Sequence, residues 1–125
     1  MRISPALAEF LTERHLAVLV TLRADGSPHA VPVGFTYADG VVIVITAGSS
    51  VKATNASAGG RACVTQLDGA RWVTLEGSVR VVHDAPSVVR AVAAYARRYR
   101  QPKERDDRVV IEIEVDRVMC NSRLK

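Results

Sequence analysis

The chain has 125 residues, of which 48% are hydrophobic and 24% charged, and these proportions are typical of a globular protein of one domain. The formal net charge of +4 suits an anionic partner, but no Lys/Arg run interleaved with aromatic residues supports nucleic-acid binding. No signal-peptide pattern and no apolar run of membrane-spanning length occur. We therefore expect a single cytoplasmic domain over residues 1–125 that binds neither nucleic acid nor a membrane.

Apolar patterning predicts a short helix and three strands in the first part of the chain. An N-cap followed by proline, at Ser4 and Pro5, is typical of a helix start. Runs of apolar and β-branched residues, separated by Asp-Gly turns, predict strands over 16–22, 28–35 and 41–46. Because Pro32 has no amide hydrogen, one edge of the second strand should be unpaired.

The rest of the chain predicts two more helices and three more strands. The helices are expected over 50–58 and 85–100, and the strands over 61–67, 71–83 and 108–119. The last strand alternates strictly between apolar and charged residues, so one of its faces should be buried. Six strands joined mainly by short hairpins indicate a mainly β fold, a small antiparallel barrel with short helices.

A run of small residues with one cation follows the third strand, in the sequence TAGSSVK from Thr46 to Lys52. Small residues allow a ligand to approach the backbone, and Ser49 and Ser50 at a helix start can donate hydrogen bonds to an anion. Lys52 would supply the counter-charge. An ordinary serine-capped helix with a solvated lysine explains the same residues, so both interpretations stay open on pattern alone.

Residues for unaided catalysis do not stand out in this sequence. The nucleophile elbow, the GxGxxG fingerprint and the Walker loop are all missing, and the two cysteines and three histidines are too scattered for a metal site. If the protein is an enzyme, a cofactor should supply the reactive chemistry.

Three segments together resemble a known family: TLRADGSPHAVPVGFTY, VITAGSSVKATN and DGARWVTLEGSVRVV. They are similar to the pyridoxamine-phosphate-oxidase-like split β-barrel flavoproteins. Within that group they most resemble the actinobacterial branch that uses the deazaflavin coenzyme F420, and in particular the small mycobacterial F420-dependent biliverdin reductases. The resemblance covers nearly the whole chain.

The resemblance implies a homodimer with the cofactor in a groove between the two barrels. The backbone of the second strand would lie along the cofactor ring, and the Ser-Lys segment would bind its phosphate. Trp72 would reach the cofactor from the partner subunit, with Gln66 near it; without the resemblance, Trp72 would be interpreted as a core tryptophan. The implied cofactor-binding residues are Val31, Pro32, Val33, Gly34, Phe35, Thr46, Ser49, Ser50, Lys52, Gln66 and Trp72.

One departure from the family pattern concerns the choice of cofactor. The relatives that use flavin mononucleotide (FMN) carry an arginine on the second strand and another before the phosphate-loop lysine, and here these positions are Val31 and Val51. Fewer guanidinium contacts argue for F420, with FMN as the alternative. The pyridoxal-phosphate-binding residues of the family have no counterpart after Arg117, so vitamin B6 oxidase activity is not expected.

The expected activity is hydride transfer from reduced F420 to an unsaturated acceptor, with biliverdin reduced to bilirubin as the specific hypothesis. An FMN oxidoreductase and a non-catalytic carrier of F420 or a tetrapyrrole are the alternatives. No side chain is assigned as an obligatory acid or base. The surface arginines Arg90 and Arg97 fit a solvated helix face, and the candidate substrate-binding arginines are Arg23, Arg71, Arg98 and Arg100.

Overall fold

A computed structural model describes residues 3–125, so the first two residues of the expected domain lie outside the described part. Seven strands form one antiparallel sheet in the order β2-β1-β5-β6-β7-β4-β3. The strands are β1 (Ala17–Leu22), β2 (Pro28–Val33), β3 (Thr36–Ala38), β4 (Val41–Ala47), β5 (Arg61–Asp68), β6 (Arg71–Val82) and β7 (Arg108–Cys120). The helices are α1 (Pro5–Phe10), α2 (Val51–Ser57), α3 (Ala85–Arg98) and the 3-10 helix η1 (Ser122–Leu124).

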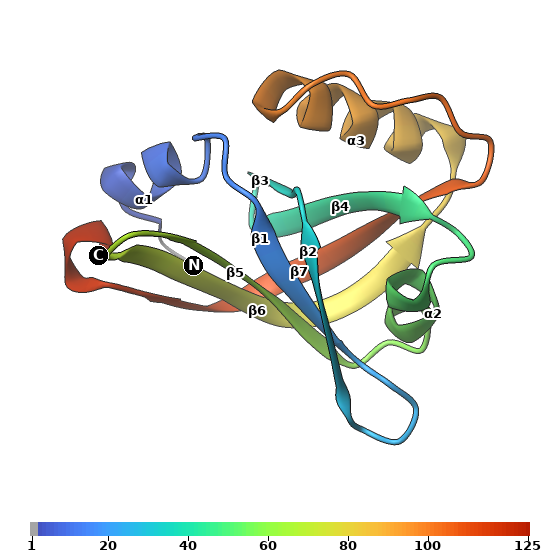
Figure 1. Ribbon diagram of the computed structural model, residues 1–125, viewed down its shortest axis with the longest axis horizontal. Helices are drawn as coiled ribbons and strands as arrows, with labels where there is room; N and C mark the ends of the chain where they lie inside the picture. Colours follow the sequence, from blue (N-terminus) through green and yellow to red (C-terminus); the bar gives the residue numbers. More distant parts are fainter. Residues whose placement is uncertain (1–2) are drawn as a thin grey trace.

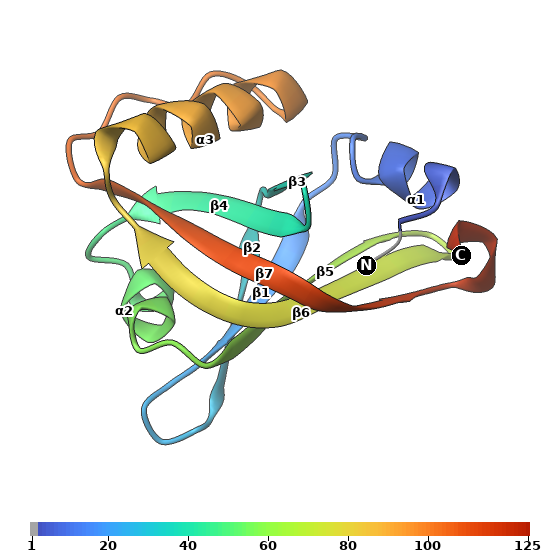
Figure 2. The ribbon, with the colours of Figure 1, turned by 180° about the vertical axis from the view of Figure 1, so that it is seen from behind.

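The sheet curls into a barrel because its two end strands are neighbours in sequence (Figures 1 and 2). Only Gly34 and Phe35 separate β2 from β3, yet β2 pairs with β1 and β3 pairs with β4. This corrects the prediction of one strand over 28–35 and raises the strand count from six to seven. The free edge expected at Pro32 is confirmed, since among the described residues β2 pairs with β1 alone. The mainly β split-barrel class is therefore confirmed.

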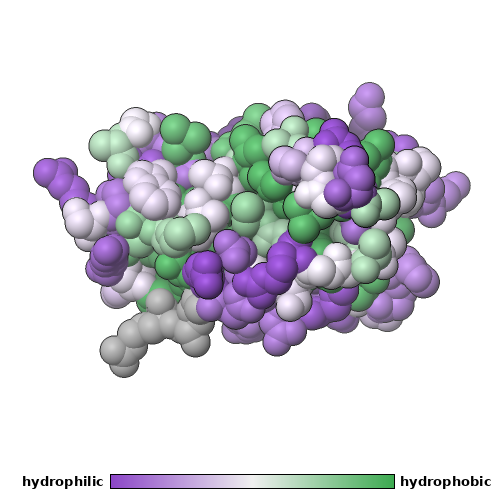
Figure 3. Space-filling view, turned by 90° about the horizontal axis from the view of Figure 1, so that it is seen from below, coloured by the Kyte–Doolittle hydropathy of each residue, from purple (hydrophilic) through white to green (hydrophobic). Residues whose placement is uncertain are grey.

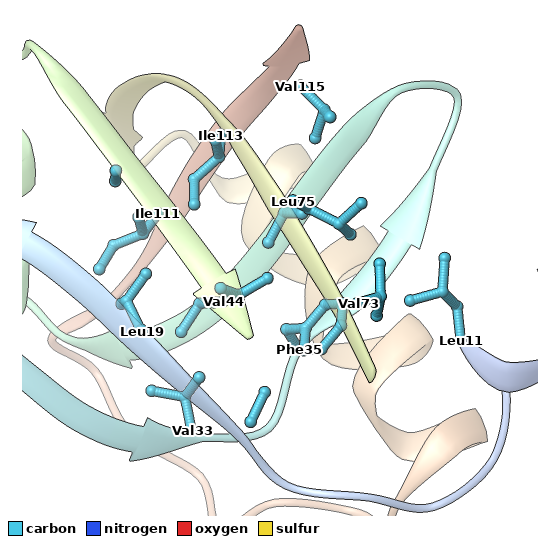
Figure 4. Close-up of a cluster of buried hydrophobic side chains, with 14 of the residues drawn as sticks. Leu11, Leu19, Val33, Phe35, Val44, Val73, Leu75, Ile111, Ile113 and Val115 are labelled. Carbon is cyan, nitrogen blue, oxygen red and sulfur yellow. The ribbon is translucent and has the colours of Figure 1, made fainter. Parts of the chain in front are cut away.

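The core fills the inside of this barrel with side chains from six of the strands and from the loop after α1 (Figure 4). Each strand contributes alternate residues, as the period of two requires. Burying such a side chain stabilises the fold by roughly 1.5–3 kcal/mol. The labelled core residues are Leu11, Leu19, Val33, Phe35, Val44, Val73, Leu75, Ile111, Ile113 and Val115.

The three predicted α-helices are all present, and each covers a different part of the barrel (Figure 1). Ser4 caps α1 by accepting a hydrogen bond from the Leu7 amide, and its hydroxyl donates to the Leu124 carbonyl, which joins the two ends of the chain. Asp84 caps α3, which lies over the side of the barrel formed by β3 and β4. None of the described helices is both long and apolar enough to span a bilayer.

Gly77 packs tightly against β7 at a register shift in β6. A Cβ atom at this position would lie 1.8 Å from the Glu114 carbonyl oxygen. We expect Gly77→Ala to lower the free energy of unfolding by about 3 kcal/mol, because relief requires breaking the β6–β7 ladder. Ser78→Ala, an exposed neighbour, should change it by less than about 0.5 kcal/mol. Urea unfolding of both variants measures this, and equal effects would contradict the packing argument.

Candidate cofactor-binding site

A cavity of about 410 Å³ occupies the split of the barrel, between the free edge of β2 and β4. The start of α2, the last part of α3 and the loop before β7 complete it. Of the residues expected to bind a cofactor, it is lined by Pro32, Val33, Gly34, Thr46, Ser50 and Lys52. The fold therefore brings the second strand and the Ser-Lys segment, which are separated by a hairpin in sequence, to the same cavity.

Two arginines that sequence reasoning missed also line this cavity, Arg105 and Arg108. Strand pairing places them there, because Ala47 at the end of β4 is opposite Arg108 at the start of β7. The Gly48 amide also donates to the Asp107 carbonyl at 2.7 Å. The pattern showed only a charged loop here, and the pairing of the third and last predicted strands would have been needed to find both arginines.

The Ser-Lys segment uses part of its polar groups to cap α2. The Ser50 hydroxyl oxygen accepts from the Ala53 amide at 3.2 Å and from the Thr46 hydroxyl at 3.1 Å. The Ser50 hydroxyl hydrogen is still free to donate to an anion in the cavity. Ser49 is exposed and does not line the cavity, whereas Lys52 is half-buried in it and makes no recorded ion pair within residues 3–125. Capping and anion binding are thus compatible at this segment.

The corner between β2 and β3 is held by the end of α3. A Cβ atom on Gly34 would lie 3.0 Å from the Tyr95 ring and 3.1 Å from the Tyr99 ring, so a larger residue would press both rings outward. The Phe35 amide donates to the Tyr99 hydroxyl at 3.2 Å, and that hydroxyl donates to the His15 carbonyl at 2.7 Å. Burial raises the pKa of Tyr99, which keeps the hydroxyl protonated and able to donate.

Arg98, the last residue of α3, is half-buried and fixes the same corner. Its guanidinium donates to the Glu13 carbonyl at 2.9 Å, to the Phe35 carbonyl at 2.6 Å and to the Gln66 side-chain oxygen. Burial lowers the pKa of Arg98, although the group stays charged in the ordinary pH range.

Gln66, which has no exposed surface, donates in turn to the Phe10 carbonyl at 3.0 Å. Neither Gln66 nor Arg98 lines the cavity in this chain. Val31 and Phe35 likewise pack toward the core and do not line the cavity.

Two other candidate substrate arginines make contacts inside the chain. Arg23 donates to the Pro28 carbonyl at 2.6 Å across the β1–β2 hairpin. Arg71 donates to the Glu13 carboxylate at 2.9 Å and to Asp68 at 2.6 Å, and it stacks over the Phe10 ring. Arg100 differs, since it is exposed and makes no recorded hydrogen bond or ion pair within the described chain.

Trp72 lies far from the split. It follows the β5–β6 turn, which sits at the opposite end of the molecule from α2 (Figures 1 and 2). There it is 39% exposed and lines a separate hollow of about 600 Å³ with residues of β7 and the C-terminal segment. Within one chain, Trp72 and Lys52 therefore do not face the same cavity.

A split antiparallel barrel with an apolar and basic cavity in its opening defines a class of cofactor-binding proteins. The family model of pyridoxamine 5'-phosphate oxidase matches residues 3–120. The chain belongs to this family, as the resemblance predicted.

Individual relatives agree with this assignment. The chain is 50% identical to the F420H2-dependent biliverdin reductase of Mycobacterium tuberculosis (strain CDC 1551 / Oshkosh), and the match covers 98% of this chain and 91% of that protein. A crystal structure of a conserved hypothetical protein from Mycobacterium tuberculosis is similar with a TM-score of 0.82 at 24% identity, covering 96% of this chain and 85% of the other. A structure described as an F420 reductase has a TM-score of 0.73 at 21% identity, with coverage of 89% and 94%. These two structures show a shared fold.

The Tyr99 hydroxyl is expected to stabilise the corner measurably. Tyr99→Phe leaves the buried Phe35 amide without its partner and should lower the free energy of unfolding by about 1–3 kcal/mol. Tyr95→Phe is the matched control, because that hydroxyl has no recorded hydrogen bond in the described chain. Its effect should stay below about 0.5 kcal/mol in the same denaturant titration. Equal effects of the two changes would show that the hydroxyl does not hold the corner.

The ion pair between Glu13 and Arg71 should make stability depend on pH. Hydrogen bonds from Arg71 and His15 lower the pKa of Glu13 from 4.5 to about 2 in the folded chain. The unfolded chain therefore takes up the proton first as the pH falls, so the stabilisation is complete above pH 4.5 and is lost as the pH approaches 2. We expect the difference in Tm between wild type and Glu13→Gln to shrink over this range. A difference that stays constant between pH 5 and pH 2 would contradict the assignment.

Proposed function

We propose that the cavity in the split binds coenzyme F420, and the observation that carries the proposal is its two-part lining. One part of the lining is apolar: Val33 and Ile45 lie there together with Gly34, which has no side chain to keep a ligand from the backbone. The lining also includes the cations Lys52, Arg105 and Arg108. The Arg105 guanidinium is paired with the Asp107 carboxylate at 3.0 Å, and Arg108 donates one hydrogen bond to the Lys103 carbonyl at 2.7 Å. A planar ring with an anionic phosphate and polyglutamate tail matches both parts. The relative with 50% identity, an F420H2-dependent enzyme by its name, supports the same choice.

FMN is the alternative cofactor, and Arg105 and Arg108 weaken the case against it that rested on missing arginines. Val31 and Val51 still stand where FMN-dependent relatives carry arginine. Arg105 and Arg108, however, bring guanidinium groups to the cavity from another segment, although Asp107 already pairs with Arg105. The preference for F420 therefore depends less on a shortage of cations than on its longer anionic tail, which can use several of them.

We propose hydride transfer to an unsaturated acceptor as the reaction, with biliverdin reduced to bilirubin at its central bridge. Reduced F420, when bound, supplies the hydride, and the acceptor also takes up one proton. The residues of this chain would bind and orient: the β2 backbone would contact the ring, and the cations of the lining would hold the tail. The Gly34 corner, fixed by Arg98 and Tyr99, sets the position of that backbone.

A second copy of the chain is proposed as the partner, with the outer face of β1, β5, β6 and β7 as the contact surface. Strand pairing sets Leu67 beside Trp72 and Thr74 beside Met119 on adjacent strands. Leu67, Trp72 and Met119 are 61%, 39% and 42% exposed, which is apolar surface that a partner could cover. The view from below shows hydrophobic side chains exposed among hydrophilic ones (Figure 3). In such a dimer, Trp72 would complete the cavity of the other subunit.

The activity is tested by adding biliverdin to the purified protein with reduced F420 and following both compounds by absorbance. We expect one bilirubin to form for each F420 oxidised, and no bilirubin without protein. Tight F420 binding without any turnover would instead make the protein a carrier. Turnover that requires FMN would overturn the cofactor assignment.

Removal of the Lys52 charge should weaken F420 binding because the contact with the phosphate is lost, while contacts with the ring are unchanged. Lys52→Ala loses a charge-assisted hydrogen bond to phosphate, and its Kd should rise about 10- to 100-fold. The phosphate-free ribityl deazaflavin should bind wild type and variant equally. Arg90→Ala, which removes one exposed charge on α3, is the control and should leave both affinities unchanged. A similar loss of affinity for the ribityl deazaflavin in Lys52→Ala would show that Lys52 does not act through the phosphate.

The shared site can be tested by mixing subunits. If Lys52 and Trp72 of one cavity come from different chains, Lys52→Ala and Trp72→Ala homodimers are both impaired, while a mixed dimer regains one intact cavity. After unfolding and refolding together, we expect about one quarter of the wild-type F420-binding capacity to return. No recovery above the two separate variants would place both residues in the cavity of one chain or outside it.

A further inference from the structure

A second hollow, of about 270 Å³, lies at the C-terminal end of α3. The loop between α1 and β1 contributes Arg14 and Leu16 to its lining, and the end of α3 contributes Tyr95, Tyr99 and Arg100. We call it the Arg14–Arg100 hollow. The resemblance pointed to Arg100 without a location, and Arg14 carried no expectation at all.

This hollow adjoins the cofactor cavity through a single side chain. Tyr95 lines both the cavity in the split and the Arg14–Arg100 hollow. Its ring packs beside that of Tyr99, with 4.9 Å between ring centroids, and both rings rest on the bare backbone of Gly34. A flat molecule that contacts the ring site at Gly34 can therefore extend past Tyr95 into the hollow.

The charge of the hollow is positive and has no recorded counter-ion within the described chain. Arg14 donates one hydrogen bond to the Tyr99 carbonyl, which orients its guanidinium and leaves most of its five N–H donors free. Arg100 makes no recorded hydrogen bond or ion pair in residues 3–125. Glu13, next to Arg14 in sequence, is bound instead by Arg71 and His15, at 2.9 Å to each.

The floor between the two arginines is apolar. Leu16 is 65% exposed there, and the faces of the tyrosine pair form the adjoining wall. Two guanidinium groups flanking an apolar and aromatic surface suit a flat conjugated body that carries carboxylates, because guanidinium binds carboxylate in a bidentate manner.

We propose that the Arg14–Arg100 hollow binds the carboxylate end of the acceptor, and that the acceptor is therefore a flat conjugated molecule with at least one free carboxylate. The inference rests on the proposed function, since it assigns the acceptor side of the same site. It also separates the candidate arginines: Arg23, Arg71 and Arg98 are held by contacts within the chain, and Arg14 and Arg100 recognise the acceptor. The competing explanation is that basic residues at a helix C-terminus only offset the helix dipole.

The test is a spectroscopic titration with biliverdin and with its dimethyl ester, performed both on the protein alone and on the protein saturated with oxidised F420, so that no turnover occurs. We expect Arg100→Ala to raise the Kd for biliverdin about 10-fold or more while the Kd for the ester stays as in wild type. Arg100→Lys should restore part of the affinity. Arg97→Ala, which removes an exposed charge of the same helix end outside the hollow, should change neither Kd.

The kinetic readout separates recognition from general damage. In turnover, Arg100→Ala should raise the KM for biliverdin and leave kcat and the F420 Kd unchanged. Arg14→Lys should raise the KM for biliverdin by a smaller factor, because lysine keeps the positive charge. The proposal is overturned if Arg97→Ala weakens biliverdin as much as Arg100→Ala, if the ester is affected equally, or if wild type binds no biliverdin in either state. Failure of the proposed cofactor is seen separately, as wild type that binds biliverdin but not F420.

Discussion

The half-buried guanidinium of Arg98 is the contact on which the architecture of the site depends. It joins the loop before β1, the β2–β3 corner and β5 to the end of α3 through three hydrogen bonds, and it stacks on the Phe35 ring at 4.7 Å. Burying a charge is costly, and here the acceptors that surround it offset the cost. Its loss would leave the Gln66 side-chain oxygen without its donor and the Phe35 carbonyl with only the Tyr99 hydroxyl at 3.2 Å, so the corner would be held less firmly.

The corner in turn creates both recesses of the site. Because the chain leaves β2 at Gly34 and joins the far end of the sheet as β3, the barrel stays open along β2 and the cavity forms in that opening. The two tyrosines that pack on Gly34 stand between the cavity and the Arg14–Arg100 hollow. Since Tyr95 lines both, the two recesses are adjacent. A cofactor ring and an acceptor with a carboxylate could therefore lie next to each other without any dedicated catalytic side chain, which agrees with a chain whose role is placement.

Sequence patterns predicted most elements because caps, Asp-Gly turns and alternation are local signals. The break at Gly34 was missed for a physical reason: Val31, Val33 and Phe35 all face inward, so the alternation continues through the corner. The roles of Arg98 and Gln66 depend on partners far along the chain, and a polar residue in an apolar segment looks the same whether it binds a ligand or the backbone. Arg14, Tyr95, Arg105 and Arg108 reach the site only through strand pairing and helix packing. The resemblance found the two segments that line the cavity, while the comparisons established the family.

The most direct test of the central claim, that the opening of the barrel is a deazaflavin site, is a parallel equilibrium titration of the wild-type protein with F420 and with FMN at one ionic strength. The lining combines exposed backbone at Gly34, apolar side chains and three cations. It predicts saturable F420 binding at least about 10-fold tighter than FMN binding. This preference should fall as salt screens the charges of the tail. Equal or tighter binding of FMN would contradict the assignment of these cations to the longer anionic tail. Absence of binding by either would remove the cofactor site itself.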